Sequence, residues 1–441
     1  MVTKKGAVAR IAATALVVGL TGATLSACSS PSGGSDNSAD PTSGSLSIGM
    51  NQGLIPQFQT YVDDYNKTNP GVKITLSPVP DNQSDYIQQL VTQGLSNTVP
   101  DIVFNYDTLN TTLQSNGLLY DLKPWLDAGK DGLSGSSYVP AFLNQYNSDD
   151  GSQITGIPVS ADSTMLFYNK SLFAKAGITD LPTSSWTMDD LYRVSKEITA
   201  ASGGSYWGIR TPMGAGDAIF VDYPALKAGG SSIYNPDTKK FEFADAKGIA
   251  VWKTLLAPYT EKWGSPYPDA AQDVNYFSGG QAAMSLDTRP AIAKDRTTLT
   301  DDWDVANLPT LDGNPTVGGG SYALSISAKS NNKELAWAFM AWFYSADGGM
   351  AAAAPNGVIP ATTEGLTNGT WLKDTNPIPA NLIPATQYAV TNAALPPAIP
   401  QAAATQLAPT LKQAAQEVVL GGKSVEEAYG AAQDTLNALL Q

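Results

Sequence analysis

Histidine is absent from this chain of 441 residues, and cysteine occurs once, at Cys28. The absence of histidine removes the commonest general base, the usual partner of a nucleophile and the commonest ligand of transition metals. A single thiol in an exported protein forms no internal disulfide. The composition therefore argues against an enzyme of these classes and indicates no metal and no cofactor.

Nucleotide-binding loops are also missing. The chain has no Gly-x-x-x-x-Gly-Lys-Ser/Thr loop and no Gly-x-Gly-x-x-Gly after a predicted strand. The run Gly318-Gly319-Gly320 lacks the following lysine that a phosphate-binding loop requires. Carboxylates remain, and glycoside hydrolysis needs only two of them, so a secreted carbohydrate-active enzyme stays as an alternative.

Only the N-terminus carries an apolar run of notable length. Three basic residues precede an uncharged apolar stretch, residues 11–25, which is too short and too rich in small residues for a membrane span. Leu25-Ser26-Ala27-Cys28 follows, and this segment resembles the signal of bacterial lipoproteins. The resemblance implies that residues 1–27 are removed and that Cys28 carries a lipid anchor, rather than being an idle thiol.

Residues 28–45 are mostly serine, glycine, proline, aspartate and asparagine, a composition that predicts a flexible tether. Removal of residues 1–27, which carry three positive and no negative charges, changes the formal net charge from −14 to −17. Such an acidic body is a poor partner for nucleic acid. The chain is longer than the size at which a single hydrophobic core stops growing, so two lobes are expected.

Strand and helix patterns alternate after the tether. Leu46, Ile48 and Met50 alternate with small or polar residues, and an apolar face at helical spacing runs from Phe58 to Tyr65. A second strand at 72–76, a helix around 87–95 and a third strand at 101–104 follow. This β-α-β-α-β order predicts an α/β fold with a sheet of parallel neighbours.

Helices are also predicted near residues 187–198, 335–343, 411–419 and 425–439. Thr187 and Ser424 each stand three residues before an acidic residue, the spacing of a capping box. Gly421-Gly422 separates the last two helices.

Several segments, in order, resemble the bacterial family of extracellular solute-binding proteins that includes maltose-binding protein. The matching segments are Asn69-Pro70-Gly71-Val72-Lys73-Ile74, Pro100-Asp101-Ile102-Val103-Phe104, Ile157-Pro158 through Asn169-Lys170, Ser278-Gly279-Gly280-Gln281-Ala282-Ala283-Met284, Trp303-Asp304-Val305 with Leu308-Pro309, and Gly421 through Ala428. Each segment alone is weak, but their order extends over nearly the whole mature chain.

The resemblance implies a two-lobed periplasmic-binding-protein-like fold of type II, with the ligand in a cleft between lobes joined by crossovers. Residues 45–158 plus 310–372 would form lobe one, and 160–307 plus 373–441 lobe two. It further implies a monomeric, extracytoplasmic receptor that passes a small carbohydrate to the membrane subunits of an ATP-binding-cassette (ABC) importer. The lipid on Cys28 would hold this receptor at the outer face of the cell membrane.

Candidate ligand residues follow the first and third predicted strands, because ligands bind beyond the carboxyl ends of strands in open α/β sheets. A sugar site needs aromatic surfaces and fixed hydrogen-bonding groups. The candidates here are Asn51, Gln52, Asn105, Tyr106 and Asp107. Asn51 and Gln52 fit equally a loop that leads into the helix, and the cluster at 105–107 fits ligand contact better than simple helix capping.

Further candidates are implied by the resemblance. Asp162 follows the first crossover, where relatives place an acidic ligand group; its alternative is a hinge hydrogen bond. The rest are Trp207, Arg210, Asp222, Tyr223, Asp287, Arg289, Gly319, Gly320, Ser321, Tyr322 and Asn356. Trp207 fits the core equally, the Asp287-Arg289 pair fits a structural salt bridge, and the glycines suggest a backbone that approaches ligand closely.

Three functions remain from the sequence. The leading hypothesis is a transport receptor for a mono- or oligosaccharide. The second keeps the receptor and changes its ligand to another polar solute, such as a polyamine or a sugar phosphate. The third is the secreted carbohydrate-active enzyme.

Overall fold

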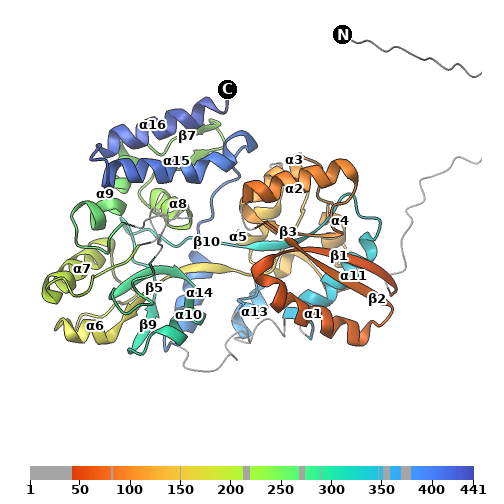
Figure 1. Ribbon diagram of the computed structural model, residues 1–441, viewed down its shortest axis with the longest axis horizontal. Helices are drawn as coiled ribbons and strands as arrows, with labels where there is room; N and C mark the ends of the chain where they lie inside the picture. The colour runs from red at the N-terminus through yellow and green to blue at the C-terminus, as the bar shows by residue number, and fades with distance from the viewer. Residues whose placement is uncertain are drawn as a thin grey trace, which may run out of the picture. The chain divides into compact units, whose positions relative to one another are not determined.

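The structure is a computed structural model (Figure 1). It describes residues 42–80, 83–148, 150–211, 219–267, 274–289, 291–345, 347–350, 358–368 and 379–441. The predicted signal, Cys28, most of the predicted tether and Asn356 lie outside these residues. In the part of the chain that is described, no helix combines the length and the apolar character needed to cross a membrane.

The strands are β1 (Gly44–Asn51), β2 (Val72–Val79), β3 (Ile102–Tyr106), β4 (Ile157–Pro158), β5 (Asp162–Asn169), β6 (Tyr234–Asn235), β7 (Lys240–Phe241), β8 (Met284–Thr288), β9 (Trp303–Ala306), β10 (Gly319–Gly320) and β11 (Tyr322–Ile326). The α-helices are α1 (Ile55–Thr68), α2 (Gln83–Ser96), α3 (Asn110–Ser115), α4 (Lys123–Asp127), α5 (Pro140–Leu143), α6 (Lys170–Lys175), α7 (Met188–Ser202), α8 (Ile219–Ala228), α9 (Ala246–Thr260), α10 (Ala291–Thr298), α11 (Lys333–Tyr344), α13 (Thr363–Asn368), α14 (Leu382–Asn392), α15 (Gln401–Val419) and α16 (Val425–Ala438).

The first sheet has the order β2-β1-β3-β11-β4. Strand β1 pairs in parallel with both β2 and β3, as the β-α-β-α-β order predicted, while β11 runs antiparallel to β3 and β4. Neighbouring residues of β3 point to opposite faces of the sheet. Both faces carry apolar side chains, and helices cover both of them. Phe104 belongs to the same apolar cluster as α1 and α11, and Val103 packs in a second cluster with residues of α2 and α3.

The second sheet is built around β5. Strand β8 pairs antiparallel with β5. Strand β10 pairs antiparallel with the start of β5, and β9 pairs antiparallel with its end. Helix α14 packs on this sheet, and the Asp304 carboxylate accepts hydrogen bonds from the Asn381 backbone N–H at 3.0 Å and from its side chain at 3.2 Å. The chain after residue 379 is thereby joined to the second sheet.

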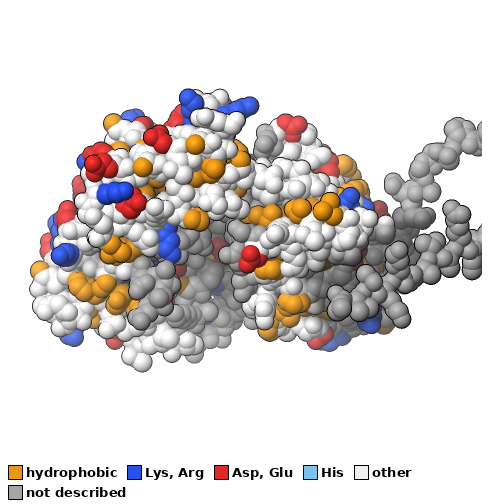
Figure 2. Space-filling view, turned by 45° about the horizontal axis from the view of Figure 1, so that its top comes forward, with side chains coloured by type: hydrophobic (Ala, Val, Ile, Leu, Met, Phe, Trp, Pro, Cys, Tyr) orange, Lys and Arg blue, Asp and Glu red, His pale blue; other side chains and the backbone are white. Residues whose placement is uncertain are grey.

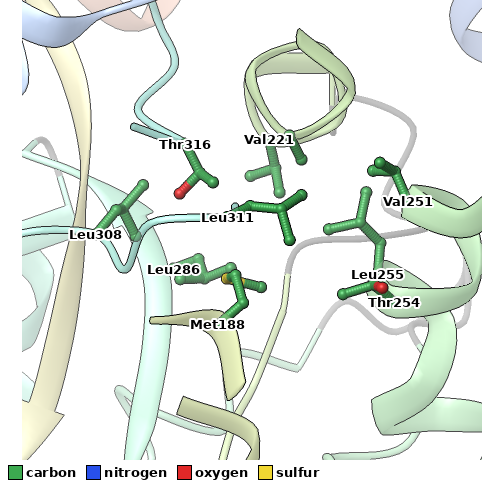
Figure 3. A pocket seen from close by; sticks show the side chains of 10 residues that line it. Met188, Val221, Val251, Thr254, Leu255, Leu286, Leu308, Leu311 and Thr316 are labelled. Atoms are coloured by element: carbon green, nitrogen blue, oxygen red, sulfur yellow. The ribbon is translucent and has the colours of Figure 1, made fainter. Parts of the chain in front are cut away.

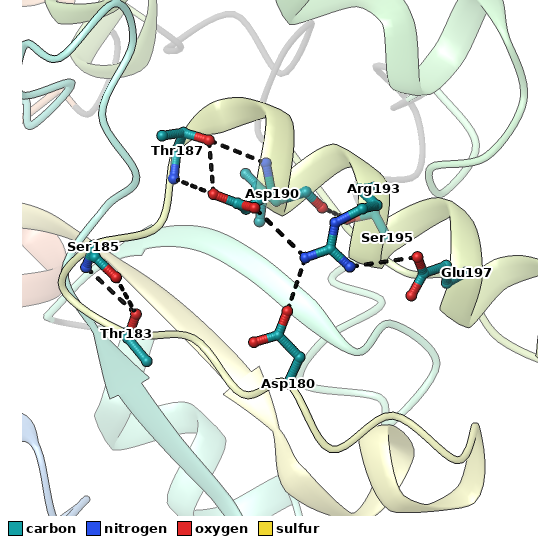
Figure 4. A network of polar contacts seen from close by, with 9 residues as sticks. Asp180, Thr183, Ser185, Thr187, Asp190, Arg193, Ser195 and Glu197 are labelled. Atoms are coloured by element: carbon teal, nitrogen blue, oxygen red, sulfur yellow. Dashed lines mark hydrogen bonds and ion pairs between the residues drawn. The ribbon is translucent and has the colours of Figure 1, made fainter.

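Helix α7 begins with the predicted capping box (Figure 4). The Thr187 hydroxyl accepts from the Asp190 N–H at 3.3 Å, and the Asp190 carboxylate accepts from the Thr187 N–H at 3.0 Å. Arg193 then contacts Asp180, Asp190 and Glu197 on the exposed side of the helix. Helix α16 has the same box between Ser424 and Glu427, so both predicted helix starts are confirmed.

The chain passes between the two sheets along two segments that lie side by side (Figure 1). Strands β4 and β5 form the first crossover, and β10 and β11 form the second. Residues 310–320 were expected in the first lobe, but β10 pairs with β5 of the second sheet, and Thr310 bridges Thr187. The second crossover therefore lies near residue 321 rather than 310, because the backbone of residues 310–320 packs on the second sheet.

Candidate functional site

Polar side chains from both sheets gather at the two crossovers. From the first sheet, the Asn51 amide donates to the Tyr106 hydroxyl at 3.0 Å and its oxygen accepts from the Gly53 N–H at 2.9 Å. Asn51 thus caps the following turn and also positions Tyr106, and its contact with a ligand stays a prediction. Gln52 is exposed at the start of that turn.

Tyr106 and Tyr322 form an aromatic pair at the end of the first sheet. They are opposite each other in the β3–β11 register, and both rings pack on Phe104, at 4.8 and 4.6 Å between centroids. Both rings are partly buried. A half-buried phenol combines an apolar face with a hydroxyl group, a suitable surface for a sugar ring.

Asp107 follows Tyr106 and contacts the second crossover. Its carboxylate accepts from the Ser321 N–H at 2.8 Å and from the Thr108 N–H at 2.7 Å. Because an ionised carboxylate accepts several hydrogen bonds, Asp107 is of the chemical type that can also bind a ligand hydroxyl.

Asp162 begins β5, directly beyond the first crossover, and accepts from the Ser160 hydroxyl at 2.9 Å. Burial raises the pKa of Asp162, while the Ser160 hydrogen bond and the positive charge of Arg289 act in the opposite direction. The alternative of a hinge hydrogen bond is thus present in the structure, and the same carboxylate lies among the other candidate groups.

The second sheet contributes Arg210, Asp287 and Arg289. Arg210 lies beside β8, where its backbone N–H donates to the Met284 carbonyl at 2.8 Å. Its guanidinium is 3.4 Å from the Asp287 carboxylate, and both arginines are buried. Asp287 therefore forms its recorded ion pair with Arg210, which lies far away in sequence, whereas the sequence suggested a pair with the nearby Arg289.

Close packing within the protein is one physical reason for the glycine run. A Cβ at Gly318 would overlap the carbonyl oxygen of Phe220, and a Cβ at Gly319 would overlap that of Asp162. These glycines allow close packing of the second crossover against α8 and β5. Of the three glycines, Gly320 faces a side chain of the candidate site, the Asp107 carboxylate, at 3.3 Å from the place of a Cβ.

Asn105 and Trp207 do not join this group. Asn105 is fully buried, and its amide donates to Asn110 and Ser325 inside the first lobe. Trp207 bridges Ala282, about 17 Å along the sheet from Asp287 at roughly 3.3 Å per residue. Asn105 faces inward because residues alternate along β3, and Trp207 lies at the opposite end of β8.

Asp222 and Tyr223 lie in the first half of α8 and are both buried. Burial raises the pKa of Asp222 well above its usual range, and its Oδ1 has no hydrogen-bond partner among the described residues. Among the described residues, no hydrogen bond or ion pair is recorded between either residue and the crossover group, so their ligand role stays a prediction.

Two residues of the group were not predicted. Ser160 stands between Pro158 and Asp162, so its place in the crossover was a signal available in the sequence. Tyr146 is fully buried, and the charges of Asp107 and Asp162 add to the burial that raises its pKa. No local pattern marks Tyr146, since only the fold brings it to the crossovers.

A separate cavity of about 20 Å³ lies inside the second lobe (Figure 3). Its lining includes Met188, Val221, Leu255, Leu286 and Leu308, and Thr254 and Thr316 are its polar members. The cavity is too small and too apolar for a sugar, so it is a packing defect of the core.

Charge and metal chemistry give no competing site. On the face that Figure 2 shows, acidic and basic side chains are interspersed, without a basic stripe for nucleic acid. Among the described residues, no group of three or more aspartates, glutamates or cysteines is placed to hold a metal ion. The crossover group therefore remains the candidate site, with acceptors, donors and two phenol rings.

Comparisons with known proteins agree with this architecture. The family model for the bacterial extracellular solute-binding protein matches residues 52–350. The multiple sugar-binding protein of Streptococcus mutans is 22% identical over 358 residues, which cover 75% of this chain and 77% of that protein.

Two solved structures are also similar. A substrate-binding protein of Listeria monocytogenes in complex with cycloalternan has a TM-score of 0.77 at 20% identity, covering 90% of this chain and 98% of that one. UgpB of Mycobacterium tuberculosis in complex with glycerophosphocholine has a TM-score of 0.74 at 16% identity, covering 90% and 98%. These likenesses show the two-lobed fold of type II substrate-binding proteins.

Proposed function

Since this chain belongs to the family of bacterial extracellular solute-binding proteins, we propose that it captures a carbohydrate between its lobes and delivers it to an ABC importer. Lobe one comprises residues 45–158 and 321–372, and lobe two comprises residues 160–320 and 373–441. The observation that carries the proposal is the gathering of polar groups from both sheets at the crossovers.

A ligand at this place favours the closed state, because only then does it contact both lobes. Tyr106 and Tyr322 offer ring faces, and Asp107, Asp162 and Asp287 offer acceptors for hydroxyl groups. This combination suits a neutral, hydroxyl-rich solute. The named ligands of similar proteins, cycloalternan and the sugars of the Streptococcus mutans protein, support the same class.

A second candidate ligand is a polar solute with an anionic group. Arg210 and Arg289 are both buried in the second lobe, next to the crossovers, and UgpB is described with glycerophosphocholine. The ion pair of Arg210 with Asp287 favours the neutral solute, because an anion would compete with a carboxylate already in place.

The receptor works outside the membrane without breaking any bond of its ligand, and it is a monomer anchored through lipid on Cys28. The support is the N-terminal sequence and the composition, which lacks histidine. Replacing Cys28→Ser should abolish incorporation of labelled palmitate and release the protein from membranes. Retention of the label in this variant would refute the assignment of Cys28.

Isothermal titration calorimetry tests the ligand class. We expect heat from at least one of cycloalternan, maltose, tagatose and other sugars, together with a smaller radius of gyration in X-ray scattering. Glycerophosphocholine binding without any sugar binding would favour the second candidate. Steady turnover of a bound sugar would overturn the receptor role.

Asp162→Asn tests the site itself. Because a hydrogen bond to a charged group contributes about 1.5–3 kcal/mol, the variant should bind the sugar at least about ten-fold more weakly. Asp127→Asn is the control, since Asp127 is exposed and pairs with Lys123 on α4, away from the crossovers. Equal affinity of Asp162→Asn and the parent protein would remove Asp162 from the site.

A further inference from the structure

The two crossovers pair with each other in two different registers. On the side of the first sheet, Pro158 is opposite Ala323, and on the side of the second sheet, Asp162 is opposite Gly320. Three residues separate the pairs on the first crossover and two on the second. The first crossover therefore has one extra residue at the point where the chain leaves one sheet for the other.

One extra residue in an antiparallel pair is a β-bulge, which bends the strand and increases its twist. It also changes the face on which later side chains lie, so it decides where Asp162 points relative to Pro158. Near the bulge, the Val159 N–H still donates to the Tyr322 carbonyl at 2.8 Å.

Ser321 adds a side-chain hydrogen bond at the bulge. Its hydroxyl donates to the Ser160 carbonyl at 2.7 Å, a normal length for a hydroxyl donor, and the residue is buried. The extra backbone donor of the bulge, the Ala161 N–H, donates to the Ile359 carbonyl at 2.9 Å. A third segment of the chain thus completes the hydrogen bonding of the bulge.

The same two serines hold the carboxylates on either side. The Asp107 N–H donates to the Ser321 carbonyl at 3.2 Å, and the Ser321 N–H donates back to the Asp107 carboxylate at 2.8 Å. The Ser160 hydroxyl donates to the Asp162 carboxylate at 2.9 Å. An unbroken chain of hydrogen bonds therefore joins Asp107 in the first sheet to Asp162 in the second through both crossovers.

We propose that Ser321 and Ser160 are positioning residues with separate tasks at a bulged hinge. The Ser321 hydroxyl fixes the angle between the crossovers, and the Ser160 hydroxyl holds Asp162 toward the ligand. This inference rests on the proposed function, in which a ligand favours closure of the lobes. Movement of the lobes and contact with the ligand are then coupled through the hydroxyl groups of these two serines.

Distances between spin labels test the first task without a ligand. Leu95 in α2 and Leu420 after α15 are 86% and 72% exposed, so Leu95→Cys and Leu420→Cys, with Cys28→Ser, carry the labels. Loss of one hydrogen bond should change the ratio of open to closed protein about five-fold in Ser321→Ala. Ser160→Ala keeps the carbonyl acceptor and should show the parent distribution.

Calorimetry with cycloalternan or maltose, whichever binds the parent protein more tightly, tests the second task. Ser160→Ala should weaken binding about ten-fold, as expected for a bond to a carboxylate. If Ser321→Ala does not fold, Ser321→Cys, which keeps the volume and weakens the donor, takes its place.

The outcomes separate the inference from the proposed function. Parent-like label distances in both Ser321 variants, or parent-like affinity in Ser160→Ala, would overturn the inference even if a sugar binds. If no sugar binds while only the Ser321 variants change the distances, the hinge task is supported and the carbohydrate proposal fails.

Discussion

Asp222 gives the sharpest test of the energetics of the second lobe. Its side chain is 4% exposed, its Oδ1 has no hydrogen-bond partner among the described residues, and burial raises its pKa well above the usual range. Among the described residues, Tyr259, Tyr267 and Tyr429 lie within its electrostatic reach, and burial raises the pKa of each phenol, that of Tyr267 to about 12. These phenols stay neutral at physiological pH, so none of them supplies a positive charge.

The direction of the pH effect follows from the raised pKa. The folded protein binds the Asp222 proton more tightly than the unfolded chain, whose aspartates titrate near pH 4. The free energy of unfolding therefore falls as the pH rises from about 4 through the folded pKa, and it levels off above that value. At pH 7.5 the carboxyl group destabilises the fold, whether it stays protonated or is ionised.

Asp222→Asn removes the titration and keeps the size of the side chain. An unpaired buried polar group costs about 1–3 kcal/mol, and more if it is charged. Asparagine keeps a buried polar group but cannot ionise, so the variant should recover only the free energy linked to the raised pKa, at least about 1 kcal/mol at pH 7.5, and most of this gain should vanish near pH 4. Melting temperatures at both pH values measure the difference, with the exposed Asp127→Asn as the control.

Two results would refute the reasoning. An equal change of melting temperature at pH 4 and pH 7.5 would show that the titration of Asp222 does not contribute. A lower melting temperature of Asp222→Asn at pH 7.5 would show that the ionised carboxylate is stabilised by a partner.

Two further predictions concern local packing and capping. Gly318→Ala should destabilise the protein by more than about 2 kcal/mol in thermal unfolding, because the new Cβ would overlap the Phe220 backbone. Gly430→Ala, in open space on α16, should instead stabilise the protein by about 0.5–1 kcal/mol. Equal effects of the two substitutions would contradict the packing argument. Thr187→Ala should cost about 1 kcal/mol through loss of the α7 capping box, whereas Arg193→Ala should cost less than about 1 kcal/mol, since its ion pairs are exposed (Figure 4). Chemical denaturation compares the last two variants, and a larger loss in Arg193→Ala would reverse the assignment.

Local sequence patterns predicted the elements well. The alternation of Leu46, Ile48 and Met50 predicted β1, and the spacing from Phe58 to Tyr65 predicted the buried face of α1. The capping boxes at Thr187 and Ser424 predicted two helix starts. These features depend on residues within one or two turns of each other, so a single sequence contains their physical cause.

Part of the candidate site was also visible in the sequence, because polar residues that follow a strand must lie at the edge of its sheet. Tyr106 and Asp107 are placed as that rule predicts, whereas Asp162 was a candidate only through the family resemblance and stands at the start of β5. Asn105 is the exception, since the pleat of β3 turns it inward to Asn110 and Ser325. A shift of one residue along a strand is enough to reverse such a prediction.

Sequence alone thus determined the helices, the strands, the parallel order of the first three strands and the lack of histidine chemistry. Tertiary structure alone decided that Arg210 pairs with Asp287, that Gly318 packs on Phe220, and that the crossovers meet out of register near Ser321. The physical reason is the range of the interactions. Hydrogen bonds and ion pairs between residues far apart in the chain exist only after two segments pack, and no local pattern records which segments those are.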